Sequence, residues 1–351
     1  MTDTNKPITI KTIAKELNIS FSTVSKALNN NPAIKEETRK MVLDKANEMG
    51  YTPNSLAKGL RSNSTKTIAI IFNDIENPVL TYIFRIISIK MADHGYTTMI
   101  FDSQFSEKIE RANILTVLSR QPDFIILEPT SMNSTNLQLL SEMSNRLILQ
   151  GVRYETNCHH VHVDYAHGGY LAACKMLSNG HRDCLVITEP LSFPTSEQFV
   201  LGIERAYSEY HIPFNRDMVK TTHSSIANGF QTMQKLWDYD TNAFSIPFTG
   251  VLTFDDTLAH GVYKAAMQYN FKIPEDISVI GFDDNPLSAF SMPPLTTIHL
   301  PKEKMAENYI RILQSALLEG RTETCFFSSD PILVSRDSVG NLLKKNRRNE
   351  V

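Results

Sequence analysis

The sequence predicts an all-α head followed by a larger α/β body built from two parallel-sheet subdomains. Three observations lead to this prediction. Short capped helical segments occupy the first fifty residues, a polar run at residues 62–66 follows them, and strands and helices alternate from Thr67 onward. A chain of 351 residues is also too long for one ordinary core, which favours two or three domains.

The head is predicted to contain three helices. Thr9 is positioned to cap a helix over about Ile10–Leu17, and Ser20 to cap a second helix that ends at Leu28. A third helix is expected over Glu36–Met49. Two short helices joined by a tight connection are typical of a helix-turn-helix, whose second helix enters the major groove of DNA.

The second helix predicts which side chains meet DNA. Val24 and Leu28 are spaced to face the core, which turns the rest of the helix outward. The side chains expected on the outer face are Phe21, Ser22, Ser25 and Lys26. Ser22 and Lys26 suit base edges, Phe21 suits a thymine methyl, and the hydroxyls of Thr23 and Ser25 suit phosphates. The alternative is a surface helix of a small helical cap.

The segment after the head is predicted to be a helix that does not form alone. Pro53 suits a first helical turn, but residues 53–61 contain few apolar side chains. Gly59 weakens such a helix further, by about 1 kcal/mol relative to alanine. Residues 62–66 then form the first domain boundary.

The body alternates strands with helices, which predicts parallel sheets with ligands bound at the carboxyl ends of the strands. The expected strands are Thr67–Phe72, Thr97–Phe101, Phe124–Leu127, Leu147–Leu149, Val161–Val163, Cys184–Ile187, Gly250–Thr253 and Ser278–Gly281. The expected helices are Val79–His94, Lys108–Ser119, Gly168–Asn179, Glu197–Tyr210, Ala227–Trp237, Asp256–Tyr269 and Lys302–Glu319.

Charge separates the head from the body. Residues 1–66 contain eleven Lys/Arg and six Asp/Glu, a net charge of +5; since the whole chain carries −3, the remainder carries −8. A basic head on an acidic body indicates that the head meets phosphate and the body does not. The tail at residues 341–351 is basic again and is expected to fray.

Composition also argues against disulfide-bonded, membrane-spanning and metal-binding proteins. The four cysteines are scattered without a Cys-x-x-Cys pair, which favours free thiols in a reducing compartment. The first seven residues are polar and no run of about 18 apolar residues exists, so we expect a cytoplasmic protein without a membrane span. Cys158, His159, His160 and His162 alternate along a predicted strand, so we expect no metal there, and no cofactor.

The head resembles that of the LacI/GalR family of bacterial transcription regulators. The resemblance is carried by residues 9–14, 22–29, 37–39, Gly50-Tyr51-x-Pro53-Asn54 and Leu56-Ala57-x-x-Leu60-Arg61. It implies that Phe21, Ser22 and Lys26 read bases and that residues 53–60 form a hinge helix in the minor groove, with Leu60 as its wedge. The DNA-contacting set that follows is Thr9, Ser20, Phe21, Ser22, Thr23, Ser25, Lys26, Asn29, Asn54, Ala57 and Leu60.

Two positions of the head depart from the family pattern. Lys26 replaces the commoner arginine, so a bidentate guanine contact becomes a single-point contact. Lys35 stands where a serine usually caps the third helix. The first departure leaves the operator sequence open.

The body resembles the periplasmic-binding-protein-like core of the same family. The motifs include Asn77-Pro78, Asp164-x-x-x-Gly168-Gly169, Phe254-Asp255-Asp256, the run at residues 273–284 and the run at residues 294–298. The resemblance implies crossings between subdomains near Tyr165, Pro294 and Ser328. The subdomains would then comprise about 67–164 with 295–328, and 165–294 with 329–340.

The resemblance also implies a ligand site between the subdomains. The positions that would line it are Val79, Leu80, Thr130, Asp164, Phe193, Thr195, Phe199, Leu252, Asp255 and Asp283. Phe199 stands where many family members have an arginine, which leaves three acids without a cation. We therefore expect a neutral, hydroxyl-rich effector stacked on an aromatic ring, or a cationic one. Asp256, and less often Asp283, are alternatively helix caps.

Together these features predict a homodimeric repressor, not an enzyme. It would bind a near-palindromic double-stranded operator under control of a small, carbohydrate-like effector. Two alternative classes of protein fit the sequence less well. An enzyme lacks support because no nucleophile elbow, P-loop or Gly-x-Gly-x-x-Gly is present. A free-standing sugar-binding protein would need a signal peptide and would lack the head.

Overall fold

The computed structural model describes residues 8–52, 64–131 and 134–343. The chain forms two compact units, Met1–Thr65 and Lys66–Val351, which are described separately below. The boundary falls at the end of the polar run that separates the predicted head from the predicted body.

The head is a three-helix unit, as predicted. Its helices are α1 (Ile10–Glu16), α2 (Phe21–Leu28) and α3 (Glu36–Glu48). Ile13, Val24 and Val42, one from each helix, are fully buried against one another. Burying side chains of this size contributes roughly 1.5–3 kcal/mol each, so a core this small leaves little reserve.

Side-chain caps fix where the first two helices begin. The Thr9 hydroxyl accepts a hydrogen bond from the Thr12 backbone N–H, and the Thr12 side chain accepts one from Thr9. The Ser20 hydroxyl accepts a hydrogen bond from the Thr23 N–H at 3.0 Å. Lys35 precedes α3 without a capping hydrogen bond, as expected for a lysine at this position.

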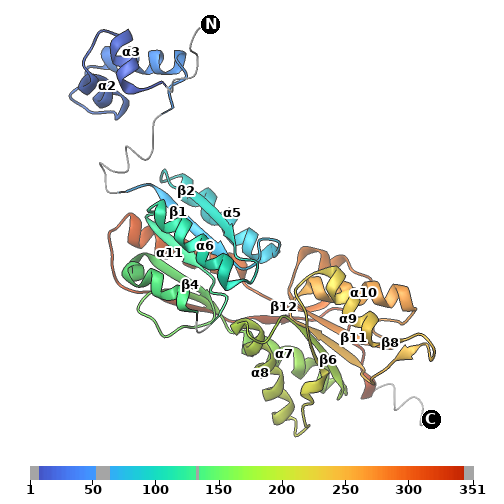
Figure 1. Cartoon of the computed structure of the whole chain (residues 1–351). Helices are drawn as coiled ribbons and strands as arrows, with labels where there is room; N and C mark the ends of the chain where they lie inside the picture. Colours follow the sequence, from blue (N-terminus) through green and yellow to red (C-terminus); the bar gives the residue numbers. More distant parts are fainter. Residues whose placement is uncertain (1–7, 53–63, 132–133, 344–351) are drawn as a thin grey trace. The chain divides into compact units, whose positions relative to one another are not determined.

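The first sheet of the body has the strand order β13-β5-β4-β3-β1-β2, and all its neighbours are parallel. Its strands are β1 (Thr67–Phe72), β2 (Thr97–Asp102), β3 (Phe124–Leu127), β4 (Leu147–Gly151), β5 (His159–Val163) and β13 (Phe326–Ser329). Figure 1 shows helices on both faces of this sheet. They are α5 (Pro78–Ala92) and α11 (Lys302–Leu317) on one face, and α6 (Glu107–Ser119) with the 3-10 segment η1 (Thr135–Arg146) on the other.

The second sheet has the order β14-β12-β11-β10-β6-β7 and is parallel except for β14. Its strands are β6 (Cys184–Thr188), β7 (Val219–Thr221), β10 (Gly250–Thr253), β11 (Ser278–Asp283), β12 (Thr296–His299) and β14 (Ile332–Val334). One face is covered by α7 (Tyr165–Ser178) and α8 (Pro194–Glu209), the other by α9 (Ile226–Leu236) and α10 (Asp256–Tyr269). This is the predicted fold class, an all-α head and a body of two parallel-sheet subdomains.

Strand alternation divides the core of the body into layers. In β1, Ile68, Ile70 and Phe72 face α5 and α11, whereas Ala69 and Ile71 face α6 and η1. All five side chains are fully buried, because helices cover both faces of the sheet. The rigid sheets hold the carboxyl ends of their strands in fixed positions.

Two helices of the second subdomain approach closely through glycines. A Cβ added to Gly202 of α8 would lie 1.8 Å from the Ala166 carbonyl oxygen of α7, and one added to Gly169 would lie 2.1 Å from the Phe199 carbonyl oxygen. No side chain larger than hydrogen fits at these positions without separating the helices.

The chain crosses between the sheets three times: between β5 and α7, between β12 and α11, and between β13 and β14. The first and third crossings lie close to the predicted Tyr165 and Ser328. The prediction of a crossing near Pro294 is wrong, because Thr296–His299 first pairs with β11 in the second sheet. The crossing follows at Leu300 and Pro301, just before α11.

The sequence prediction missed several short elements. These are β7, β12, β13, the antiparallel strand β14, the 3-10 helices η1, η2 (Arg216–Met218) and η3 (Pro286–Phe290), and the hairpin of β8 (Trp237–Asp238) with β9 (Ala243–Phe244). Most are too short for periodicity to reveal them. The body also continues into the predicted tail, since the Leu342 N–H donates to the Asn179 carbonyl oxygen.

Candidate DNA interface and ligand cavity

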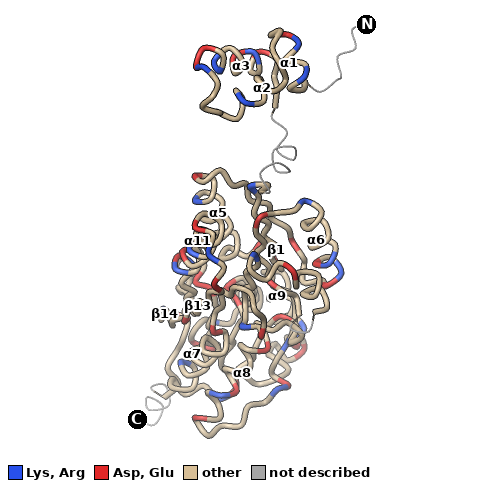
Figure 2. The backbone as a smooth tube through the Cα atoms, turned by 90° about the vertical axis from the view of Figure 1, so that its left-hand side faces the viewer, with Lys and Arg blue, Asp and Glu red and all other residues tan. Residues whose placement is uncertain are grey.

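The start of α2 presents an outward face of polar and aromatic side chains. Phe21 is 41% exposed, although most large apolar side chains of the head face its core. Ser22 and Lys26 are also exposed. Among the described residues, no carboxylate lies within ion-pair distance of Lys26, so its ammonium is available to a phosphate or a base edge. Figure 2 shows the basic and acidic residues along the helices of the head.

Other predicted DNA-contacting residues of the head have structural tasks as well. The exposed Thr9 and Ser20 cap α1 and α2, and the Ser20 and Thr23 hydroxyls lie 2.8 Å apart. The Asn29 amide donates to the Ser25 carbonyl oxygen at 2.8 Å at the end of α2. These bonds fix both ends of the helix that carries Ser22 and Lys26.

Ser25 corrects the sequence prediction. It was expected on the outer face, but its side chain is 8% exposed and lies on the buried side of α2 with Val24. It follows Phe21 by four positions, which places it on a side of the helix that is nearer to the core than Ser22 and Lys26 are. Asn54, Ala57 and Leu60 lie outside the described residues.

A cavity lies between the two sheets of the body, where the carboxyl ends of their strands meet. The empty space in and around it is about 780 Å³, a figure that includes open solvent. Both subdomains contribute to it: Asn73, Glu128 and Gln150 come from the ends of β1, β3 and β4, and Glu189 and Asp255 follow β6 and β10. Ligands of open α/β sheets bind at such edges.

Six of the ten predicted effector-binding residues line this cavity. They are Val79, Leu80, Phe193, Thr195, Asp255 and Asp283. Val79 and Leu80 come from the first turn of α5, whose start is fixed by the Asn77 side chain accepting from the Val79 N–H at 2.8 Å. Thr195 lies close to Gly151 of the opposite subdomain. A Cβ added to Gly151 would lie 3.6 Å from the Thr195 methyl carbon.

The other four predicted residues do not line the cavity, so the prediction for them is corrected. Phe199 is fully buried, with its ring edge-on to Phe254 at 5.7 Å and to Phe282 at 5.6 Å. Leu252 is also fully buried, in the layer under α7 and α8. An apolar ring at position 199 gains more from this core than from a polar cavity.

Thr130 and Asp164 are polar but act elsewhere. Thr130 is buried behind the cavity, where its hydroxyl donates to the Asn73 side chain and its N–H donates to Glu110. Asp164 is exposed and caps α7 by accepting from the His167 N–H at 2.8 Å. It borders a separate recess with Arg153 and His162.

Five carboxyl groups line the cavity: Asp74 and Glu128 from the first subdomain, and Glu189, Asp255 and Asp283 from the second. Burial raises the pKa of Glu128 to about 7 and that of Asp255 to about 6. Burial, followed by the charge of Asp255, raises the pKa of both Glu189 and Asp283 well above the ordinary range. Burial likewise raises the pKa of Asp74. Each carboxyl is therefore easier to protonate than in water.

The two subdomains touch across the cavity. The Asn77 amide donates to Asp283 at 3.3 Å, and the Phe105 ring stacks on Phe193 at 4.8 Å between centroids. Asp283 and its neighbour Asp284 have φ values of 98° and 54°, in the left-handed region that non-glycine residues rarely adopt. The chain thus bends at the end of β11 to bring Asp283 to the cavity.

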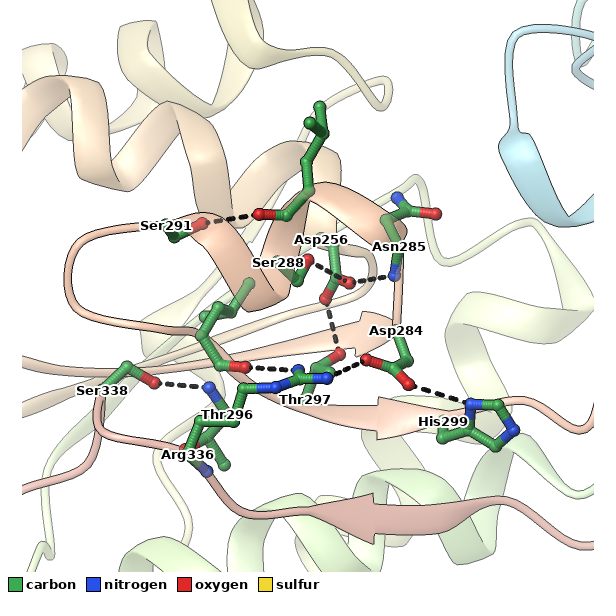
Figure 3. Close-up of polar contacts among 12 residues, drawn as sticks. Asp256, Asp284, Asn285, Ser288, Ser291, Thr296, Thr297, His299, Arg336 and Ser338 are labelled. Atoms are coloured by element: carbon green, nitrogen blue, oxygen red, sulfur yellow. Dashed lines mark hydrogen bonds and ion pairs between the residues drawn. The ribbon is translucent and has the colours of Figure 1, made fainter.

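Asp284 anchors this bend from behind. Its carboxylate accepts from Arg336 at 2.6 Å and lies 3.0 Å from His299, as Figure 3 shows. Arg336 also donates to the Leu295 carbonyl oxygen. Charged side chains held this way in a partly buried position fix the backbone that presents Asp283.

Asp256 corrects the expected helix cap. Asp255 caps α10 by accepting from the Leu258 N–H at 2.7 Å, and Asp256 is the first helical residue. The buried Asp256 carboxylate instead accepts from the Asn285 N–H and from the hydroxyls of Ser288 and Thr297 (Figure 3). Burial still raises its pKa to about 7. It ties α10 to the segments that follow β11 and begin β12.

The Cys-His run on β5 shows no metal arrangement. Among the described residues, no group of three or more His, Cys, Asp or Glu side chains is placed to hold an ion. The Cys158 sulfur and His160 Nε2 are 3.7 Å apart, and His160 stacks on Phe326. Burial lowers the pKa of His160 to about 4, which keeps its ring neutral.

Sequence reasoning missed several cavity residues, and one signal pointed to two of them. Glu128-Pro129 directly follows the buried strand β3, and Glu189-Pro190 directly follows the buried strand β6. An acid at the carboxyl end of a buried parallel strand is a candidate for ligand contact. Phe105, Gln150 and Tyr154 come from loops and strand ends that carry no comparable signal.

Comparison with known proteins agrees with both units. A family model for bacterial regulatory proteins of the lacI family matches residues 9–54, and a model for a periplasmic binding protein-like domain matches residues 174–339. The HTH-type transcriptional repressor PurR of Aliivibrio fischeri (strain ATCC 700601 / ES114) is 28% identical over 96% of this chain and 99% of its own. The PurR of Pasteurella multocida is 29% identical over 95% and 99%.

Solved structures share the fold. A lac repressor dimer bound to operator and the anti-inducer ONPF has a TM-score of 0.79 at 20% identity, over 95% of this chain and all of that one. A complex of the transcriptional regulator CelR with cellobiose has a TM-score of 0.68 at 20% identity, over 94% and 99%.

These matches define the class of the protein and the type of each of its two units. It is a DNA-binding transcriptional regulator, not an enzyme, with a helix-turn-helix head and a ligand-binding type of body. Its head matches the lacI family of bacterial regulatory proteins, and its body matches a periplasmic binding protein-like domain. Among its described helices, none is both long and apolar enough to cross a membrane.

Proposed function

We propose that this regulator is a homodimeric repressor whose affinity for a near-palindromic operator is set by a small molecule bound in the cavity of the body. It would act in the cytoplasm, where bacterial operators lie. The observation that supports this most directly is one chain holding both an exposed recognition helix and a cavity lined by two subdomains.

In the head, Phe21, Ser22 and Lys26 would read base edges in the major groove. They share the exposed face at the start of α2, the part of a recognition helix that enters the groove. Thr9, Ser20, Thr23 and Asn29 would contact the phosphate backbone while holding the helix ends. Ser25 is too buried for a direct contact. Asn54, Ala57 and the wedge Leu60 are proposed from the family resemblance alone.

In the body, a ligand would bridge Asn73, Glu128 and Gln150 of one subdomain with Glu189, Asp255 and Asp283 of the other. Because both subdomains line the cavity, a molecule that binds more tightly to one arrangement of the subdomains than to another would stabilise that arrangement. The DNA affinity changes by the same coupling free energy, typically about 5–150-fold.

The effector would present several hydrogen-bond donors. The cavity offers five carboxyl groups together with the Asn73 and Gln150 amides, while Phe193, Tyr165 and Phe254 provide apolar rings. A carbohydrate-like molecule fits this description, since its hydroxyls donate to carboxylates and its ring faces stack on aromatic side chains. The neighbouring structures include regulators complexed with cellobiose and with ribose.

A double dissociation tests the proposal. Operators are first selected from random DNA, and effectors are identified by the shift that they cause in operator affinity. Leu60→Ala should weaken operator binding strongly and leave effector binding unchanged, because unstacking a base step takes a few kcal/mol that the wedge helps to offset. Asp283→Ala should keep operator binding and abolish the response to the effector.

Two results would contradict the proposal. One is an operator affinity that no small molecule alters, which removes the sensing role of the cavity. The other is loss of both activities in each variant while the far-ultraviolet circular dichroism stays unchanged, since the two sites would then not be separable.

A further inference from the structure

We infer that the ligand of the body cavity is an organic cation, which binds through at least one ammonium group held between carboxylates of the two subdomains. This inference rests on the proposed function, in which the cavity is the effector site, and narrows its ligand to one chemical class.

The first observation is that both walls of the cavity carry acids. Asp74 and Glu128 face it from the first sheet, and Glu189, Asp255 and Asp283 face it from the second. The acids interact electrostatically across the cavity, since the charges of Asp255, Asp74 and Glu128 all raise the pKa of Glu189. Without a ligand, carboxylates on opposite walls repel one another when they are ionised, and this repulsion adds to burial in raising the pKa of Glu189. A cation between them turns this repulsion into attraction from both sides.

The second observation is an unpartnered oxygen on Glu189. The residue is 3% exposed and lines the cavity, yet its Oε1 has no hydrogen-bond partner. A buried carboxylate oxygen without a donor is unfavourable by more than a neutral group would be, because the charge also loses its hydration. An ammonium group supplies up to three N–H donors and the compensating charge together.

The third observation is the lack of protein cations at the site. No Lys, Arg or His is among the described residues that line the cavity. Lys302 at the start of α11 acts weakly on Asp283, but its ammonium lies over the Tyr82 ring. His223 packs against the Phe105 and Phe193 rings. The five acids therefore have no basic side chain within the cavity, and buried charges need a partner.

The apolar walls favour an organic cation over a metal ion. Phe105, Phe193, Tyr154, Tyr165 and Phe254 surround the acids. Aromatic faces attract ammonium groups and also bury the carbon skeleton that carries them. The acids are not grouped as ion ligands, since no such cluster occurs within the described residues.

Matched pairs of ligands test the charge directly. Isothermal titration calorimetry on the full-length protein would compare glucosamine with glucose, 1,4-diaminobutane with 1,4-butanediol, and 5′-amino-5′-deoxyadenosine with adenosine. The first and third pairs exchange one hydroxyl for an ammonium on the same skeleton, and the second pair exchanges two. We expect the amine to bind at least about tenfold more tightly in the pair whose skeleton fits, a difference of ~1.4 kcal/mol.

Two variants assign that preference to the cavity. Glu189→Gln keeps the shape of the side chain and removes its charge, so it should erase most of the preference for the amine while raising the melting temperature of the free protein. Glu142→Gln, at an exposed position on η1, removes the same charge outside the cavity and should leave both unchanged.

The inference is overturned if the hydroxyl member of every pair binds as tightly as the amine, or if no amine binds at all. It is also overturned if an amine binds equally well to Glu189→Gln and to the unaltered protein. When the neutral member binds as tightly as the amine and shifts operator affinity, only the charge assignment fails. When no compound shifts operator affinity but an amine binds, the proposed function fails and the cation site stands.

Discussion

The head and the body of this regulator place their polar residues in opposite ways. The head surrounds a very small core, centred on Ile13, Val24 and Val42, with an exposed face that carries Phe21 and Lys26. The body buries several carboxyl groups, including those of Glu189 and Asp255, inside a cavity between two large sheets. A surface that meets DNA needs no burial of charge, whereas a site that selects a small molecule must exclude water around it.

The comparison predicts that the body tolerates little change in its helix packing. Gly202→Ala should reduce the free energy of unfolding by ~4 kcal/mol or more, because the new Cβ would overlap the Ala166 carbonyl oxygen. Leu201→Ala, at the exposed neighbouring position, is the matched control and should have a small effect. Chemical denaturation followed by circular dichroism measures both. Equal stability of the two variants would show that α7 and α8 are not packed this closely.

A second prediction separates packing from ligand contact at two phenylalanines. Phe199→Ala should lower the free energy of unfolding by ~3–5 kcal/mol, because it leaves a hole between Phe254 and Phe282. Phe193→Ala should cost less stability and mainly weaken ligand binding, since its ring lines the cavity against Phe105. Denaturant melts and calorimetry distinguish the two. A stable Phe199→Ala protein with weakened ligand binding would instead show that Phe199 contacts the ligand, as the sequence analysis predicted.

These two phenylalanines show which feature of the site could not be predicted from the sequence. The helix α8 and its position beside the cavity follow from the pattern, but which side of the helix faces the ligand depends on how α8 rotates against α7. Gly169 and Gly202 set that rotation through their close contacts. Nothing local to Phe199 reveals it. In the head, by contrast, Thr9 and Ser20 cap helices as predicted, because a capping hydrogen bond is made within three residues.

Small errors in the position of a side chain around a helix explain two further differences. Asp255 rather than Asp256 caps α10, and Ser25 lies just inside the face that holds Ser22. A helix rotates by about 100° per residue, so a shift of one position changes a contact completely. Glu128 and Glu189 were recognisable from their place after buried strands, but their convergence across the cavity depends on the packing of two subdomains.

The buried acids of the cavity predict that the stability of the body depends on pH. Because the pKa of Glu128 is raised to about 7, the folded protein binds a proton more tightly than the unfolded chain. Its contribution is favourable at low pH and is lost as the pH rises through the folded pKa. The same holds for Asp255, with a pKa of about 6. The free energy of unfolding should therefore fall between about pH 5 and pH 8, by up to ~3 kcal/mol from Glu128.

Glu128→Gln should flatten this fall, and Glu142→Gln should not. Thermal melts at several pH values on the ligand-free protein give the comparison. A stability that rises over the same pH range would show that the cavity acids are stabilised as carboxylates by partners in the free protein.

The smallest predicted effect concerns the exposed face of α2 that carries Phe21, Ser22 and Lys26. Lys26→Ala should weaken binding to the selected operator by ~1–3 kcal/mol and relax discrimination at the base that it contacts. Lys40→Ala removes the same charge from an exposed position on α3 and should preserve the sequence preference. Fluorescence anisotropy with operator variants measures this. If both variants lost the same operator affinity and the same sequence preference, Lys26 would contribute only a general electrostatic attraction to DNA.

The central claim is that the head reads sequence and that the body controls the reading. It is tested most directly by titrating the full-length protein with its selected operator and with a scrambled duplex at moderate salt, with and without a saturating effector. The account predicts tighter binding to the operator by at least about a thousandfold. It also predicts an effector-dependent change in operator affinity of about fivefold or more. Equal affinity for the two duplexes, with no response to any cavity ligand, would contradict it.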